Sequence, residues 1–238
     1  MTCLFHNARK TQIDMGCDAD KCLVIPNGIQ FDRFKGIPLK TDDGWVDIGA
    51  VVRLAPIKDV KTMIYAFFEL HERLPKVRLH IMGGVDDEEY GAECHALVET
   101  LGVRDLIFTG RVNVVEYMEK LDFTILTSIS EGQPLSVLES LAARRPCVTT
   151  EVGCCRELLE GAPGDDFGVA GFVTPPMYRK GLADAMERMC VSRARRIEMG
   201  ERGQRRVATY FLHEQMLANY RALYDDTARA FDLPREGE

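Results

Sequence analysis

The chain has 238 residues, of which 46% are hydrophobic and 28% charged, and its formal net charge is −7 at neutral pH. This composition is typical of a globular protein with a sizeable core, and the acidic balance argues against a nucleic-acid-binding protein, which usually carries a basic excess. Eight cysteines without a regular framework, the lack of an apolar run of about 18 residues and the lack of an apolar signal-peptide centre together predict a cytoplasmic protein with reduced thiols.

The first 44 residues differ in pattern from the rest of the chain. A polar stretch of helical character reaches about Gln12, and the Asn27-Gly28 pair in IPNGIQFDRF is a strong turn signal. We interpret residues 1–22 as the remnant of an interdomain connector, and we expect no sheet before Trp45.

From Trp45 onward, short apolar runs alternate with stretches of helical period, which is the pattern of repeated β-α units and a parallel sheet. After Pro176 the pattern becomes wholly helical, and the arginines between Ser192 and Arg206 are expected to form a solvated helix face. These features predict an α/β, Rossmann-like, doubly wound parallel sheet with carboxyl-terminal helices. The expected strands are 46–51, 77–82, 105–109, 122–127, 146–150 and 171–174, and the expected helices include 60–74, 90–101, 115–121, 134–143, 178–190, 194–210 and 214 to about 230.

The loops that follow the predicted strands are the places to search for a ligand site. An open parallel sheet binds its ligand beyond the carboxyl ends of its strands, so these loops should converge on one edge of the sheet. Four of them carry polar or glycine-rich sequences, namely Arg53 to Lys58, Gly83-Gly84, Gly110-Arg111-Val112 and Ser128 to Pro134.

The character of these loops indicates a phosphate site without a standard fingerprint. Neither GxxxxGK[ST] nor GxGxxG occurs, which disfavours a P-loop NTPase and a dinucleotide-dependent oxidoreductase. Cations and helix amino termini can bind phosphate instead: Arg53 can donate parallel hydrogen bonds, Lys58 can act as a point charge, and Gly132 lets the backbone approach closely. A surface salt bridge is the alternative interpretation of either cation.

Glu131 and Glu139 discriminate between two kinds of sugar chemistry. At about 1.5 Å per residue, eight helical steps would separate them by about 12 Å, whereas glycosidase pairs lie about 5–5.5 Å or about 6.5–9.5 Å apart. Glu139 shares a helix face with Leu135 and Leu138 and should be partly buried, and a buried carboxylate needs donors. Ribose hydroxyls could supply them, with a sugar meeting Glu131 at the other end. A salt bridge from Glu139 to a neighbouring helix is the alternative.

Four motifs stand out along the chain: RLAPIK (53–58), FTGRV (108–112), SEGQPLSVLES (130–140) and VGCCREL (152–158). They resemble the carboxyl-terminal, donor-binding domain of the family-four retaining glycosyltransferases of the GT-B fold, whose E-x7-E motif has the spacing of Glu131 and Glu139. Within that family, the chain is most similar to the members that act in Pel exopolysaccharide synthesis. Gln133 and Asp59 depart from the family's commoner aromatic residue and glycine, which limits what can be inferred about the sugar.

The resemblance implies a donor site for a nucleotide-diphosphate sugar of the UDP-glucose type within residues 23–238, including the helices of 178–230. Arg53 and Lys58 would bind the diphosphate and stabilise the charge on the leaving group, so that no metal and no cofactor are expected. Glu131 would contact the transferred hexose. The other implied donor-binding residues are Gly83, Arg111, Val112, Gly132, Leu135, Ser136 and, at the ribose, Glu139.

The resemblance also implies that a complete enzyme has an amino-terminal acceptor domain, which this chain would lack. The expected partners are a UDP-sugar, a glycan acceptor held by the missing half, membrane-bound polysaccharide synthase subunits, and a second copy of the chain through aromatic residues of the last helices. A non-catalytic nucleotide-sugar-binding or assembly module stays open as the alternative function.

Overall fold

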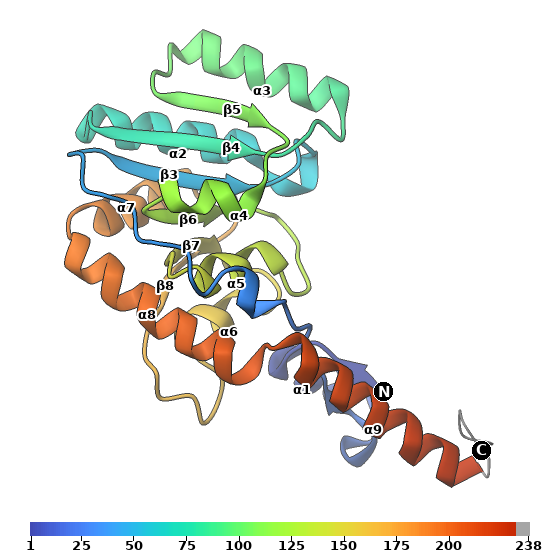
Figure 1. Ribbon diagram of the computed structural model, residues 1–238. Coiled ribbons are helices and arrows are strands. Elements are labelled where there is room, and N and C mark those ends of the chain that lie inside the picture. The colour runs from blue at the N-terminus through green and yellow to red at the C-terminus, as the bar shows by residue number, and fades with distance from the viewer. Residues whose placement is uncertain (232–238) are drawn as a thin grey trace.

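A six-stranded parallel sheet forms the centre of the computed structural model, which describes residues 1–231 without the side chains of the last four. Its order is β5-β4-β3-β6-β7-β8, and helices cover both faces (Figure 1). Every predicted strand is confirmed to within one residue at either end. The strands are β3 (Val46–Val51), β4 (Val77–Met82), β5 (Leu106–Gly110), β6 (Phe123–Leu126), β7 (Cys147–Thr150) and β8 (Gly171–Thr174).

Two hydrophobic clusters fix the helices to the sheet, one on each face. Alternate strand residues such as Ile48 and Ile81 meet Phe67 in the first cluster, whereas Met82 and Leu126 belong to the second. The first face carries α2 (Val60–Arg73), α3 (Glu88–Leu101) and α7 (Arg179–Cys190), and the second carries α4 (Val114–Tyr117), α5 (Leu135–Ala142), α6 (Cys155–Glu160) and α8 (Arg193–Tyr210).

The amino-terminal segment contradicts the expectation that no sheet precedes Trp45. Two short strands, β1 (Thr2–Cys3) and β2 (Leu23–Val24), pair in parallel and are joined by α1 (His6–Asp14). Two-residue strands are too short to show an alternating pattern, which explains why the sequence did not predict them.

Two of the arginines predicted to lie on a solvated helix face are buried instead. Arg206 is 1% exposed and donates to Asp165 and to backbone carbonyls, including that of Gly168. Arg196 is 6% exposed and bonds Asp122 and the carbonyl of Met189. Each guanidinium can be buried because a carboxylate and backbone carbonyls accept hydrogen bonds from it, although Nε of Arg196 has no partner among the described residues.

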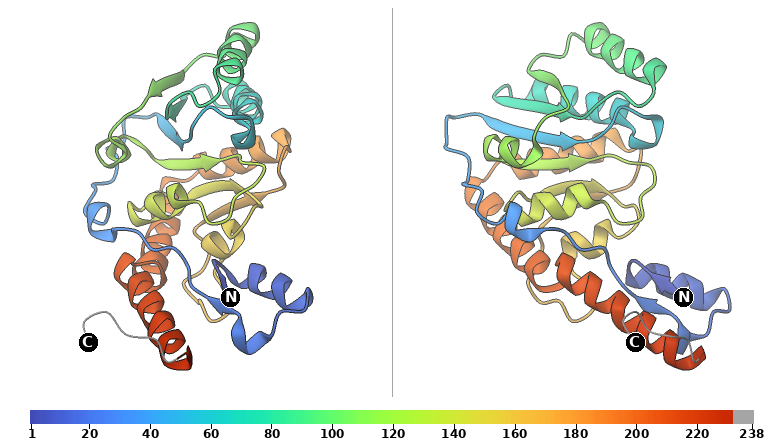
Figure 2. Two further views of the ribbon diagram at one scale, coloured as in Figure 1. Left: turned by 90° about the vertical axis from the view of Figure 1, so that its right-hand side faces the viewer. Right: turned by 45° about the vertical axis from the view of Figure 1, so that its right-hand side comes forward.

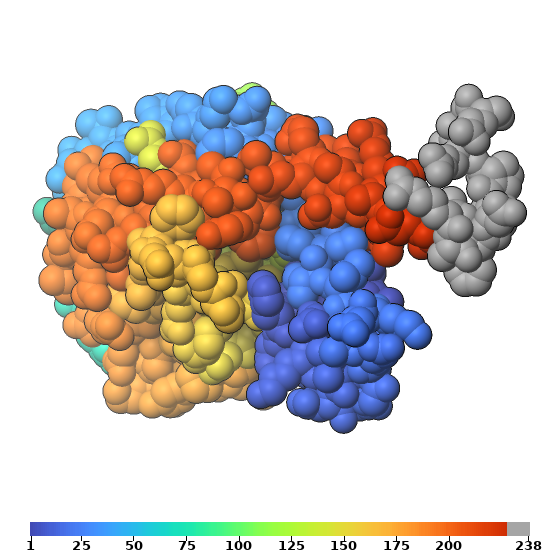
Figure 3. Space-filling model, turned by 90° about the horizontal axis from the view of Figure 1, so that it is seen from below, coloured from blue at the N-terminus to red at the C-terminus, as the bar shows by residue number. Residues whose placement is uncertain are grey.

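The last helix, α9 (His213–Phe231), projects from the body of the molecule (Figures 2 and 3). Its Tyr224 is 67% exposed and stacks on Tyr220, with ring centroids 6.3 Å apart. Among the described residues, no helix combines the length and the apolar character that crossing a bilayer requires. The end of the predicted donor domain, 232–238, lies outside the described residues.

Candidate donor-binding site

The loop after β3 begins the candidate site. Leu54 pairs with Val85 in an isolated bridge, which holds this loop against the loop after β4. A 3₁₀ turn, Pro56–Lys58, then leads into α2. Asp59 follows in a left-handed conformation, with φ 47°, and its side chain accepts a hydrogen bond from the N–H of Thr62. The position where the family commonly has glycine is therefore left-handed, and the aspartate that occupies it also caps α2.

Lys58 joins this loop to the loop after β6. Its Nζ lies 2.6 Å from Oε1 of Glu131, which also accepts a hydrogen bond of 2.6 Å from the hydroxyl of Ser128. The backbone carbonyl of Lys58 accepts from the Thr127 hydroxyl at 2.9 Å. The Lys58 and Glu131 side chains are only 19% and 14% exposed, so water screens their attraction less than it screens a surface pair. Two predicted site residues are thus held together.

Arg53 lies at the outer edge of the site and forms an ion pair with Asp86, from the loop after β4. The two side chains are 62% and 43% exposed. Pairs as exposed as this contribute little to stability, because water and salt screen them. Arg53 therefore forms the surface salt bridge that its alternative interpretation anticipates, whereas the salt bridge of Lys58 is largely enclosed.

A cleft of about 440 Å³ opens where β3, β4 and β5 end. A Cβ atom on Gly83 would lie 2.0 Å from the carbonyl oxygen of Val52, so only glycine fits there. Sequence reasoning missed Asp86, although its place directly after the predicted Gly83-Gly84 loop puts it at the same edge.

In the described part of the chain, no three His, Cys, Asp or Glu residues are grouped so that they could hold a metal ion. The predicted residues that line the cleft are Arg53, Lys58, Gly83, Arg111 and Val112.

The remaining predicted residues lie on the loop before α5 and on α5 itself, outside the lining of this cleft. The carbonyl of Gly132 accepts a hydrogen bond of 3.0 Å from the N–H of Cys154. Gly153 also packs against this carbonyl, because a Cβ atom on Gly153 would lie 2.1 Å from the Gly132 oxygen. Helix α5 has no side-chain cap, so the first N–H groups, at Leu135 and Ser136, stay available to an anion.

Glu139 is half-buried on α5, as predicted, although of the two leucines expected to share its buried face only Leu138 is buried and Leu135 is 46% exposed. Within the described residues, no donor bonds its carboxylate, and the salt bridge to a neighbouring helix that was the alternative is not formed. Burial raises the pKa of Glu139, and the positive charge of Arg33 only partly opposes this effect. A half-buried carboxylate without an internal donor is suited to bind hydroxyl groups of a ligand.

Gln133 joins the loop before α5 to the amino-terminal segment through hydrogen bonds. Its side-chain oxygen accepts from the N–H of Asn27 at 2.8 Å, and its amide donates to the carbonyl of Asn27 at 3.1 Å. Gly28 packs on the α8–α9 corner, where a Cβ would lie 2.3 Å from the Leu212 oxygen. The residue that departs from the family pattern therefore has a structural partner, which the sequence could not reveal because the two residues are far apart along the chain.

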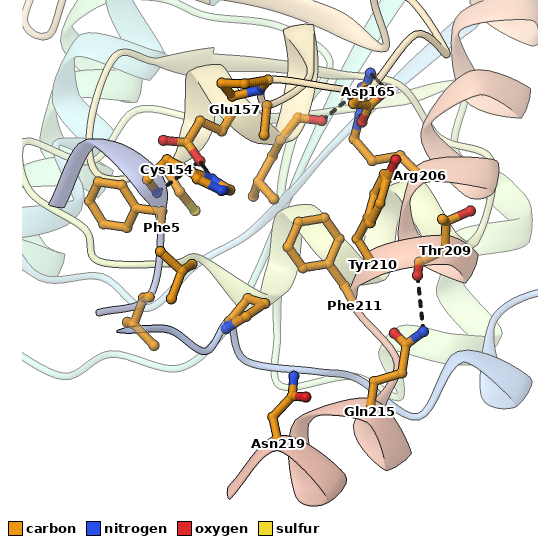
Figure 4. Close-up of a pocket in the computed structure, with 17 residues that line it drawn as sticks. Phe5, Cys154, Glu157, Asp165, Arg206, Thr209, Tyr210, Phe211, Gln215 and Asn219 are labelled. Atoms are coloured by element: carbon orange, nitrogen blue, oxygen red, sulfur yellow. Dashed lines mark hydrogen bonds and ion pairs between the residues drawn. The ribbon is translucent and has the colours of Figure 1, made fainter. Parts of the chain in front are cut away.

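A second attachment of this segment involves Glu157 on α6, which accepts hydrogen bonds from the backbone N–H groups of His6 and Asn7 at 3.1 and 2.9 Å. Helix α1 has no side-chain cap of its own, so Glu157 caps it from across the fold. A cavity of about 490 Å³ lies beside this contact, where Figure 4 shows Phe5, Glu157 and Phe211 on its walls. None of the predicted donor-site residues lines this cavity.

Comparison with known proteins identifies the family. The model of the Glycosyl transferases group 1 family matches residues 46–191, which include the cleft and the loop before α5. The chain belongs to this family.

Relatives and solved structures agree with this assignment. The chain is 27% identical over 175 residues to N-acetyl-alpha-D-glucosaminyl L-malate synthase of Bacillus anthracis, covering 73% of this chain and 43% of the relative. It is 29% identical over 141 residues to alpha-monoglucosyldiacylglycerol synthase of Streptococcus pneumoniae, covering 52% and 31%. The structure of HepE from Anabaena in complex with UDP and glucose aligns with a TM-score of 0.76 at 21% identity, covering 94% of this chain and 62% of that chain.

The match to HepE, together with the parallel sheet and flanking helices, shows the fold of a GT-B carboxyl-terminal domain. The chain spans less than half the length of the two curated relatives.

Proposed function

We propose that this chain forms the nucleotide-sugar-binding part of a retaining glycosyltransferase, whose donor is of the UDP-glucose type. The observation that carries the proposal is the cleft in which Arg53, Lys58, Gly83 and Arg111 meet at the carboxyl edge of the sheet. Three cationic side chains and a loop glycine at this edge suit a diphosphate. The UDP in the HepE complex supports a uridine nucleotide.

In the proposed complex, the diphosphate takes the place of Asp86 beside Arg53. The uncapped start of α5 contributes the N–H groups of Leu135 and Ser136 as further donors. Arg111 and Val112 frame the base, and the half-buried carboxylate of Glu139 accepts hydrogen bonds from the ribose. The expected absence of a metal follows from this arrangement, because side-chain cations and backbone amides neutralise the phosphates.

In the transfer step, charge develops on the diphosphate as the bond to the sugar breaks. Lys58 is positioned to stabilise that charge from a partly dry site, where electrostatic interactions are stronger than in water. Its ion pair with Glu131 also orients the carboxylate that would contact the hexose. We propose a glycan acceptor held by a second domain, in cytoplasmic exopolysaccharide synthesis of the Pel type. We also predict that the protein binds membrane-bound synthase subunits and associates with a second copy of itself.

Calorimetry with UDP, GDP, ADP and UDP-glucose in the presence of a metal chelator tests this proposal. We expect UDP to bind, and we expect Arg53→Ala and Lys58→Ala each to weaken binding by about tenfold, the loss of one or two charge-assisted hydrogen bonds. Arg202→Ala is the matched control, because Arg202 forms an exposed ion pair with Glu198 away from the cleft. No heat with any nucleotide from a folded sample would refute the donor site.

Two further variants test how the glutamates divide the donor. Glu139→Ala should weaken binding of both UDP and UDP-glucose, since both carry the ribose. Glu131→Ala should change the affinity for UDP-glucose relative to UDP, since only the former carries the hexose. The opposite pattern would refute the assignment of the two residues. Turnover after addition of an acceptor domain would distinguish an enzyme from a non-catalytic binding module.

A further inference from the structure

Three cysteines lie in the amino-terminal β1–α1–β2 unit, and none of them is a residue of the proposed donor site. Cys3 lies on β1, and Cys22 directly precedes β2, which pairs with β1 in parallel. The sulfur atoms of Cys3 and Cys22 are 3.6 Å apart, and both residues are buried, with exposures of 9% and 1%. A disulfide places two sulfurs at about 2.05 Å, so this contact requires a shift of about 1.5 Å to become a bond.

Cys17 lies on the turn that leads to this buried pair. It is half-buried, lies between the exposed Gly16 and Asp18, and its thiol is 3.7 Å from the carbonyl oxygen of Asp18. Arg9 of α1 holds the same turn through hydrogen bonds to the carbonyls of Cys22 and Ala19, at 2.6 and 2.9 Å. Cys17 is thus the most accessible thiol of the turn that leads to the contact between Cys3 and Cys22.

We propose that Cys3 and Cys22 form a reversible oxidation site, which a low-molecular-weight disulfide such as oxidised glutathione enters through Cys17. The Cys17 thiolate attacks the small disulfide and forms a mixed disulfide, releasing one small thiol. Cys22 then attacks the Cys17 sulfur, releasing the second small thiol, and Cys3 attacks the Cys22 sulfur, which returns Cys17 to its thiol form. In sum, two protein thiols are oxidised to one disulfide while one small disulfide is reduced to two thiols.

The surroundings of the thiols set the conditions for this exchange. Burial raises the pKa of both Cys17 and Cys22, so few of these thiols are ionised near neutral pH and exchange there is slow, and oxidation should accelerate as pH rises. Cys190 is a useful contrast: it is also half-buried, and burial raises its pKa to about 12, but it lies on α7, outside this unit.

The test uses the whole chain, reduced, exchanged into oxidised glutathione at pH 8, quenched with acid and analysed by mass spectrometry. Trypsin separates the three cysteines, because Cys3, Cys17 and Cys22 fall in the peptides 1–9, 11–21 and 22–33. We expect the intact mass to fall by two hydrogen atoms and the peptides 1–9 and 22–33 to become linked. A reducing agent should reverse both changes.

Cys17→Ser should give the same linked peptides about tenfold more slowly, since the accessible attacking thiol is gone. Cys190→Ser should react at the unaltered rate. A stable bond that joins Cys17 to Cys22 or to glutathione would overturn the proposal. So would a Cys17→Ser variant that reacts as fast as the parent chain, or a parent chain that stays fully reduced while still folded.

Discussion

Replacing Asp86 with asparagine is expected to strengthen UDP binding, although it removes a salt bridge from the protein. Asp86 pairs with Arg53, the cation that we assign to the diphosphate, so the carboxylate and the ligand compete for one guanidinium. The Arg53 and Asp86 side chains are 62% and 43% exposed, and a pair of this kind is worth about 0.2–1 kcal/mol. Releasing that amount corresponds to a gain in affinity of up to about fivefold, since about 1.4 kcal/mol is tenfold. Repulsion between Asp86 and the phosphates acts in the same direction.

Calorimetric titration of UDP into Asp86→Asn and the parent chain, at several salt concentrations, measures this gain. The ratio of the UDP affinities of Asp86→Asn and the parent chain should be largest at low ionic strength. It should approach one as added salt shortens the Debye length below about 10 Å. Glu198→Gln is the control, because it makes the same change in net charge within an exposed pair on α8. Equal gains in both variants would show a general charge effect, and weaker UDP binding by Asp86→Asn would refute the competition.

Three other predictions concern the support of the site. Gln133→Ala should lower the free energy of unfolding by about 1–3 kcal/mol in denaturant titrations, because the backbone N–H and carbonyl of Asn27 lose their partner. Gly153→Ala should destabilise the fold and weaken UDP binding together, because its Cβ would lie 2.1 Å from the Gly132 oxygen and φ is 51°; an unperturbed variant would contradict the tight contact. Glu139→Gln should weaken UDP binding yet stabilise the fold at pH 7. Burial raises the pKa of Glu139, so the parent chain loses stability as pH rises above the unfolded value of about 4.3, and the two chains should converge at about pH 3.

The central sheet could be predicted from the sequence because most of its strands are largely buried and rich in branched apolar residues. Runs such as VDIGAV and VRLHIM are mainly apolar, although they include Asp47, Arg78 and His80, and each marks one strand. The burial of Arg206 could not be predicted in this way, because helical period does not reveal that Asp165 approaches from another segment. Short elements such as β1 and α6 likewise carry too few residues to show a period.

The two cations and Glu131 could be predicted as residues at this edge of the sheet, but Asp86, the carboxylate partner of Arg53, could not. Arg53 and Lys58 stand out because they occupy one loop at the carboxyl end of β3. Asp86 becomes relevant only when the bridge between Leu54 and Val85 brings the next loop alongside. Which loops contact each other at the edge of the sheet depends on the order of the strands within the sheet. That order differs from the order of the strands along the chain, so such contacts are difficult to predict from the sequence.

The two ion pairs of the site are built differently, and this difference assigns different tasks to the two cations. Lys58 and Glu131 are mostly enclosed, and Ser128 adds a third partner, so their geometry is fixed before any ligand arrives. The Arg53 and Asp86 pair is exposed and therefore easily exchanged. Lys58 should then serve as a preorganised charge, whereas Arg53 should act as a mobile clamp that closes on the diphosphate. On this basis, the salt dependence of UDP binding should largely disappear in Arg53→Ala and persist in Lys58→Ala. Equal salt slopes in the two variants would contradict the division.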